Sequence, residues 1–371
     1  MLQGIKVLDF TQYIPGPFAT LRLAELGAEV VKIEAPEGEL ARNTDTQQGR
    51  DGLVFLVHNR LKKSVVLDLK KQEDVERAKQ IIKEADVLIE SFRPGVMNRL
   101  GLGYEQVKKL NPKLVYCSIT GYGNNGPLSH LGSHDLNYLS LSGVLSQWKS
   151  ENGKPVHPTH TIADYIGGLT ASERILAALL YRTNSAEGSY HCISITDAMT
   201  SLMGTHLLYE QMTGQRNGIP VLDGSTVSYS LYETKDHRYI SLGCLEEKFW
   251  KNFCFAVERE DWLEGHYSKK DEQNPIYQEM KALFKSKTLK EWSDFGQQVD
   301  CCLAPVLEVN EIIHHPYFKH NQQIFDAEWG DIQVRMHGDL HGPTDTPPPK
   351  KGEHTEMELK SLGMVDKLDG R

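Results

Sequence analysis

The feature that most constrains this fold is a regular alternation of short β-branched runs with amphipathic helical patterns over residues 4–182. Strands that alternate with helices are joined by crossovers, so they run parallel and helices cover both faces of the sheet. The sequence therefore predicts an α/β domain. Its expected strands cover 5–10, 29–34, 64–69, 87–90 and 115–120, and its expected helices cover 17–26, 73–85 and 165–181.

The later sequence has a different character, and this predicts a second domain. Single cores usually stop growing near ~250–300 residues, whereas this chain has 371. A Gly-containing stretch at 214–224 precedes two strand-like segments, 226–234 and 237–243, and helical patterns follow. We expect a large α/β domain at 1–215, a small α+β domain at 216–305, and a segment at 306–371 that returns to the large domain before a C-terminal tail.

Charge and composition exclude several classes of protein. The net charge of -9 disfavours a broad nucleic-acid surface. The N-terminus lacks the pattern of a signal peptide, and no apolar run approaches the ~20 residues that span a bilayer. The six cysteines lack the paired spacing of a zinc or redox site. We expect a cytoplasmic protein without a metal centre, a nucleic-acid partner or a membrane partner.

One glycine-rich motif is misleading. Gly121, Gly123 and Gly126 fit G-x-G-x-x-G directly after an expected strand. A dinucleotide site also needs a helix that opens at the last glycine, so that its N-terminus faces the pyrophosphate. Pro127 and a polar loop follow instead. We therefore expect a glycine-rich loop near the carboxyl ends of the strands, and not a nicotinamide site.

Two polar residues near this loop are candidates for catalysis. His134 lies in LGSHDLNYL, and Asp164 lies just before the helix that we expect to begin near Tyr165. A carboxylate there either caps the helix or is a functional group held by free backbone N–H groups. By spacing alone, both residues are more often solvated or capping groups than catalytic ones.

Ordered sequence blocks along nearly the whole chain add a resemblance. They include GIKVLDF, LGAEVVKIE, ADVLIESFRPGVMNRLGLGYE, LNPKLVYCSITGYGNNGP, GSHDLNYLSLSGVLS, SLGCLEEKFW and CLAPVLEVNEIIHHPYF. The chain resembles the class III CoA-transferase family, also called CaiB/BaiF, and most closely its α-methylacyl-CoA racemase branch. The resemblance implies a Rossmann-like large domain, a smaller α+β domain and an interlocked homodimer.

The resemblance also implies roles for the two candidates. Asp164 matches the shared catalytic carboxylate of the family, which carries an acyl anhydride in the transferases and moves a proton in the racemases. His134 matches the second racemase base, in a G-H-D-I-N-Y block where Ser133 replaces the glycine and Leu136 the isoleucine. Removal of an α-proton requires a base and support for the enolate oxygen, which the N–H groups of the helix near Tyr165 could give.

Further site residues follow from the same resemblance. Glu246 matches a glutamate of the racemase small domain that reaches the active site, although a surface role is equally compatible with its sequence. Coenzyme A is the only cofactor implied, as the thioester carrier of the substrate. The positions matched to coenzyme A contacts are Leu67, Asp68, Leu69, Lys70, Ser91, Phe92, Arg93, Arg99, Ser133, Asp135, Asn137 and Tyr138.

One departure from the family concerns a phosphate contact. Many members carry an arginine after the K-I-E strand, where this chain has Ala35. Arginine and lysine suit phosphate because they give charge-assisted hydrogen bonds. The missing contact could come from Lys62, Lys63 or Arg42, or from no residue.

Three functions fit these observations. The first is an acyl-CoA racemase or epimerase that acts on a 2-methylacyl-CoA by 1,1-proton transfer through an enolate. The second is a CoA-transferase that moves CoA between carboxylic acids through an aspartyl anhydride at Asp164, which does not require a histidine at position 134. The third is a coenzyme A-binding protein without catalysis, against which the His134 and Asp164 pair argues.

Overall fold

The computed structural model describes residues 1–44, 49–150, 152–337 and 346–364. The chain forms two compact units, 1–203 with 317–371, and 204–316. The domain limits given above, 215/216 and 305/306, stay predictions.

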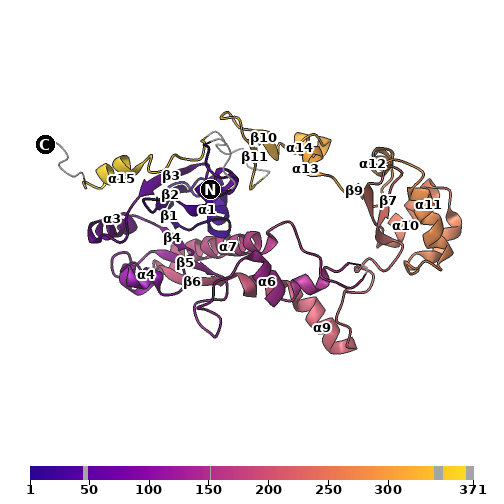
Figure 1. Cartoon of the computed structure of the whole chain (residues 1–371), viewed down its shortest axis with the longest axis horizontal. Coiled ribbons are helices and arrows are strands. Elements are labelled where there is room, and N and C mark those ends of the chain that lie inside the picture. Colours follow the sequence, from indigo (N-terminus) through magenta and orange to yellow (C-terminus); the bar gives the residue numbers. More distant parts are fainter. Residues whose placement is uncertain (45–48, 151, 338–345, 365–371) are drawn as a thin grey trace. The chain divides into compact units, whose positions relative to one another are not determined.

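A six-stranded parallel sheet organises the described part of the first unit (Figure 1, indigo to magenta). Its strand order is β3-β2-β1-β4-β5-β6. This order reverses between β1 and β4, so the loops after these two strands diverge and leave a crevice at the carboxyl edge, which is where doubly wound sheets bind ligands. The strands are β1 (Lys6–Phe10), β2 (Glu29–Glu34), β3 (Lys62–Val66), β4 (Val87–Glu90), β5 (Val115–Thr120) and β6 (Ser189–Ser194).

Strand β6 is absent from the sequence prediction. It pairs in parallel with β5, from Ser189 opposite Val115 to Ser194 opposite Thr120. Its residues alternate between partly buried and exposed positions before two buried ones, because it forms the edge of the sheet. The five expected strands are confirmed, β2, β4 and β5 with the bounds that the sequence predicts.

Two hydrophobic clusters cover the two faces of the sheet. Alternate strand residues supply each one, since successive side chains in a strand point to opposite faces. Val7 and Ile89 pack with residues of α1 and α7 on one face, whereas Leu8 and Leu88 pack with residues of α3 on the other. The three-layer α/β fold is thereby confirmed.

The helices of this unit lie between the strands and after them. The expected helix at 17–26 is α1, which begins two residues earlier and is followed by Gly27 at φ +98°. The long helix α7 begins at Ile162, three residues before the predicted start. The helices are α1 (Pro15–Glu25), η1 (Leu40–Asn43), α2 (Leu53–His58), α3 (Gln72–Lys83), α4 (Val96–Arg99), α5 (Tyr104–Val107), α6 (Asp135–Leu141), η2 (Val144–Gln147), α7 (Ile162–Ser185), α8 (Ile195–Thr200) and η3 (Ser201–Met203).

The rest of the chain adds small elements to both units. Residues after 316 return to the first unit, where α15 contacts β3. The second unit has a three-stranded sheet of order β7-β8-β9 around a core that contains Trp250, Trp262 and Trp292. None of the helices within the described ranges is long and apolar enough to cross a membrane. These elements are α9 (Gly204–Thr213), β7 (Tyr229–Glu233), β8 (Tyr239–Gly243), α10 (Glu247–Ala256), η4 (Glu260–Gly265), α11 (Pro275–Phe284), α12 (Leu289–Gln298), β9 (Leu303–Pro305), α13 (Val309–Ile312), α14 (Pro316–Asn321), β10 (Ile324–Asp326), β11 (Ile332–Val334) and α15 (Thr355–Ser361).

Candidate active site

A cavity of about 590 Å³, which we name the central hollow, lies at the crevice in the first unit. The loops after β1, β4 and β5 and the start of α7 line it. His134 and Asp164 both line this hollow, although 30 positions separate them in the sequence. The other predicted site residues in its wall are Ser91, Phe92, Arg93, Ser133, Asp135 and Tyr138.

The segment that carries His134 is fixed by hydrogen bonds. His134 precedes α6, and its backbone N–H donates to Asn137 Oδ1 at 3.0 Å. The buried Tyr138 hydroxyl donates to the Ser133 carbonyl oxygen at 3.0 Å. Asn137 and Tyr138 thus hold both polar groups of the peptide bond between Ser133 and His134, while the imidazole itself is exposed.

The carboxylate of Asp135 joins this segment to α7. Asp135 is 8% exposed, and its Oδ1 accepts hydrogen bonds from Ala163 N at 2.7 Å and Asp164 N at 3.1 Å. A side chain from α6 therefore caps a helix that begins 27 residues later. Because Asp135 follows His134 directly, one carboxylate ties the backbones of both candidate catalytic residues together.

The start of α7 corrects two predictions. Asp164 does not precede the helix but is its third residue, after the N-cap Thr161. The free N–H groups expected there are occupied, because Ile162 N donates to His160 O, Tyr165 N donates to Thr161 O, and Asp135 accepts from the other two. The prediction that these groups support an enolate oxygen is therefore wrong.

Burial alters the acidity of Asp164. The partly buried carboxyl loses hydration, and the negative charge of Asp135 adds repulsion, so the pKa of Asp164 rises to about 7. Burial also raises the pKa of Asp135. Near neutral pH, Asp164 consequently exists in both protonation states, as a group that both accepts and donates a proton must.

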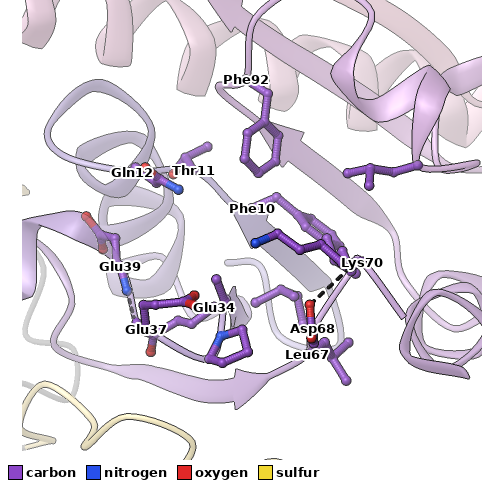
Figure 2. Close-up of a pocket in the computed structure, with 16 residues that line it drawn as sticks. Phe10, Thr11, Gln12, Glu34, Glu37, Glu39, Leu67, Asp68, Lys70 and Phe92 are labelled. Atoms are coloured by element: carbon purple, nitrogen blue, oxygen red, sulfur yellow. Dashed lines mark hydrogen bonds between the residues drawn. The ribbon is translucent and has the colours of Figure 1, made fainter. Parts of the chain in front are cut away.

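A second cavity, the edge hollow, holds about 220 Å³ and lies beyond the carboxyl ends of β1, β2 and β3. Leu67, Asp68, Leu69 and Lys70, which the resemblance matches to coenzyme A contacts, line it. Phe92 and Gln12 line both hollows, which makes the two cavities neighbours. Figure 2 shows the Lys70 side chain turned toward the middle of the edge hollow.

Three cations near these cavities have no ion pair among the described residues. They are Lys70, in the edge hollow, Arg93, in the central hollow, and Arg99, at the end of α4, and all three are exposed. Exposed guanidinium and ammonium groups without a carboxylate partner are free to bind phosphate.

The three substitutes considered for the arginine missing at Ala35 are all engaged elsewhere. The buried Arg42 guanidinium donates to both carboxylate oxygens of Glu34 at 2.7 Å and to Asp51 at 2.7 Å. All three hydrogens of the buried Lys62 ammonium have acceptors, at Asp9, Pro17 and Asn59, at distances of 2.9 to 3.1 Å. Lys63 pairs with Glu29 at 2.9 Å and Glu358 at 2.8 Å. Buried pairing argues against a phosphate contact from Arg42 and Lys62, whereas Lys63 is partly exposed and its role stays a prediction.

The remaining predicted residues lie outside the two hollows. Asn137 and Arg99 line neither cavity, and Glu246 is the exposed N-cap residue of α10 in the second unit. Gln12, which lines both cavities, is missing from the prediction, although its position directly after β1 was a usable signal. No group of three potential metal ligands converges within the described ranges.

Comparison with known proteins decides the family. The sequence matches the family model "CoA-transferase family III" over residues 2–355. The chain belongs to CoA-transferase family III. This membership confirms the resemblance drawn from the sequence blocks and makes the protein an enzyme of a family whose members act on CoA thioesters.

Relatives within CoA-transferase family III differ in their reactions. The human protein named alpha-methylacyl-CoA racemase is 32% identical, over 98% of this chain and 93% of the relative. The human succinyl-CoA:glutarate CoA-transferase is 28% identical, over 98% of this chain and 86% of the relative. A CaiB/BaiF family structure from Brucella suis superposes with a TM-score of 0.81 at 25% identity, over 97% of this chain and 99% of that one. Isomerases and transferases are thus both similar to this chain.

Proposed function

We propose that this family III enzyme is an acyl-CoA racemase or epimerase that inverts the carbon next to the thioester carbonyl of a 2-methylacyl-CoA. The observation that carries the proposal is the presence of His134 and Asp164 in one hollow, with their backbones tied together by Asp135. Inversion needs a base on one face of the α-carbon and an acid on the other, whereas CoA transfer through an anhydride needs only the carboxylate.

The acidity of Asp164 suits this reaction. In one direction the Asp164 carboxylate takes the α-proton and the His134 imidazolium returns a proton to the opposite face; in the other direction the roles reverse. Each turnover leaves the two groups in exchanged protonation states. The pKa of Asp164 is about 7, so this carboxyl changes its protonation state readily near neutral pH, as each turnover requires.

We assign the two hollows to different ends of the substrate. The nucleotide end of coenzyme A occupies the edge hollow, with Lys70 at its phosphates, and the thioester lies in the central hollow beside Ser91, Phe92 and Arg93. The shared walls at Gln12 and Phe92 support a single ligand that passes from one cavity to the other. Arg99 then contacts a phosphate outside the cavities, and Glu246 stays a candidate site residue through the resemblance to the racemase branch.

We also propose that the working enzyme is a homodimer. Helix α9 buries none of its residues, and Leu207, Leu208 and Met212 are 60%, 56% and 77% exposed. A helix with such an apolar surface usually packs against a partner. Analytical ultracentrifugation tests this proposal, since a monomer at micromolar concentration contradicts it.

A CoA-transferase reaction is the second candidate, because the similar human glutarate enzyme carries that name. In this reaction ionised Asp164 attacks the thioester carbonyl and expels the CoA thiolate, which then attacks the Asp164 carbonyl of the resulting anhydride, releases the donor carboxylate and leaves an aspartyl-CoA thioester. The acceptor carboxylate attacks this thioester and again expels the thiolate. The thiolate then attacks the acceptor carbonyl of the new anhydride, which gives the acceptor's CoA thioester and frees Asp164. His134 has no necessary role in this sequence of steps.

Isotope exchange separates the two candidates. The protein is incubated with a 2-methylacyl-CoA in deuterated water, with and without a free carboxylate acceptor, and mass spectrometry follows α-deuterium and acyl exchange. The racemase proposal expects deuterium without acceptor, lost in His134→Ala and Asp164→Ala and kept in the control His130→Ala, which changes an exposed histidine of the same loop. Acyl exchange that requires acceptor and survives His134→Ala instead establishes the transferase. Glu246→Gln slows deuterium incorporation if this side chain joins the site.

A further inference from the structure

The loop between β1 and α1 contains an unusual backbone conformation. Tyr13 has φ +63° although it carries a side chain, and it lines the central hollow. A residue with a Cβ populates this left-handed region about five- to thirtyfold less than glycine does. Surrounding contacts must therefore hold Tyr13 in this conformation.

A buried carboxylate supplies the main contact. Glu39 Oε1 accepts a hydrogen bond from Tyr13 N at 2.7 Å, and Glu39 is 2% exposed. Its other oxygen lies 2.9 Å from the ammonium of Lys32, which is fully buried. Lys32 also donates to the carbonyl oxygen of Thr11 at 2.8 Å. Glu39 and Lys32 thus hold the backbone in place on both sides of Gln12.

The same carboxylate belongs to the other cavity. Glu39 lines the edge hollow, and its backbone N–H donates to Glu34 Oε2 at 2.9 Å. Gln12 lies between Thr11 and Tyr13 and lines both hollows, and its backbone N–H donates to Ser91 Oγ at 3.2 Å. A single buried side chain therefore connects the wall of one cavity to the backbone of the other.

We propose that Glu39 is a positioning residue that holds Tyr13 in its left-handed conformation, and thereby fixes the segment Gln12–Ile14 between the coenzyme A nucleotide and the reacting thioester. The expected effect of Glu39 on turnover rests on the proposed function. The hydrogen bond that holds Tyr13 does not depend on which reaction the enzyme catalyses. A ligand in the edge hollow that restrains Glu39 restrains this segment as well.

Amide hydrogen exchange tests the hydrogen bond between Glu39 and the Tyr13 amide without any substrate. In the full-length protein, the Tyr13 amide should exchange at least about tenfold faster in Glu39→Ala than in the wild type, because its acceptor is gone. Glu39→Gln, which keeps a side-chain oxygen, should restore most of the protection. Unchanged Tyr13 protection in folded Glu39→Ala refutes the proposal.

Steady-state kinetics test whether the contact between Glu39 and Tyr13 affects turnover. Tyr13→Gly and Tyr13→Ala lose the same ring, but only alanine keeps the penalty for the left-handed region, so alanine is the matched control. We expect Glu39→Ala to lower kcat/KM for α-deuterium incorporation about tenfold in the Tyr13→Ala background and about threefold or less in the Tyr13→Gly background. The loss should fall mainly on kcat. Equal losses in the two backgrounds contradict the proposed role.

A second pair of substitutions and the hydrogen-exchange measurement distinguish a failure of the Glu39 proposal from loss of folding and from failure of the racemase proposal. If Glu39→Ala does not fold because the buried Lys32 loses its nearest carboxylate, the pair Glu39→Leu with Lys32→Met removes the acceptor together with that ammonium, and the same two comparisons apply. If even the wild type incorporates no α-deuterium, the racemase proposal fails, while the hydrogen-exchange comparison still decides whether Glu39 grips Tyr13.

Discussion

The carboxylate of Asp135 has two separable effects, and two substitutions distinguish them. Asp135 caps α7 through the N–H groups of Ala163 and Asp164, and its charge raises the pKa of the Asp164 carboxyl. Asp135→Asn keeps an oxygen for the cap and removes the charge. Asp135→Ala removes both.

The magnitudes follow from the buried cap. In Asp135→Ala two N–H groups lose their acceptor at a cost of about 1–3 kcal/mol each, so the free energy of unfolding should fall by about 2–6 kcal/mol. In Asp135→Asn the loss should be about 1 kcal/mol, since neutral hydrogen bonds replace charge-assisted ones. Without the nearby charge, the pKa of Asp164 should fall below its value of about 7.

Two measurements check this reasoning. Urea unfolding gives the stabilities, and the pH dependence of kcat/KM for deuterium incorporation gives the ionisation of the group that acts as base. For the enantiomer whose proton Asp164 removes, the acid limb in Asp135→Asn should move to lower pH. The control Asp197→Asn, which removes an exposed charge from the first turn of α8, should leave it in place. An acid limb that stays fixed or moves to higher pH in Asp135→Asn refutes the electrostatic argument, and equal stabilities of the two Asp135 variants refute the cap.

Three further outcomes are expected. Burial lowers the pKa of His58 to about 4, so as the pH falls the imidazole takes up a proton in the unfolded chain before it does so in the folded one. The free energy of unfolding, measured with urea, should therefore decrease as the pH drops from about 6.5 towards 4. This decrease should be smaller in His58→Gln. Arg42→Ala breaks the buried pair with Glu34 and should lower the free energy of unfolding by about 3–5 kcal/mol in the same assay. Lys70→Ala should leave stability unchanged and weaken coenzyme A binding about two- to fivefold, as measured by titration calorimetry.

The sequence predicts the frame of the large domain because hydrophobic periodicity is local. Strands such as 87–90 and 115–120 are mostly apolar and buried at every position, and their predicted bounds are correct. The sequence does not predict strand β6 because this edge strand, with exposed Tyr190 and Cys192, has no such apolar pattern. Local pattern thus identifies central strands better than edge strands.

The errors at the site have a different origin. The sequence predicts the start of α7 three residues too late because the cap comes from Asp135 and no side chain at the helix's own N-cap accepts a hydrogen bond. Arg42 and Lys62 are candidates for phosphate in the sequence because it does not reveal that Arg42 pairs with Glu34 and that Lys62 pairs with Asp9. Contacts between distant residues decide both points, and a single sequence does not encode them as a readable pattern.

The occupied mouth of α7 has a consequence for the design of inhibitors. Helix openings often attract anionic compounds, because unsatisfied amides offer several donors at once. Here the protein's own carboxylate fills that place. A compound that mimics an enolate should gain little by directing its oxygen at this helix, and it should instead reach past Gln12 and Phe92, which line both cavities, to contact residues of each.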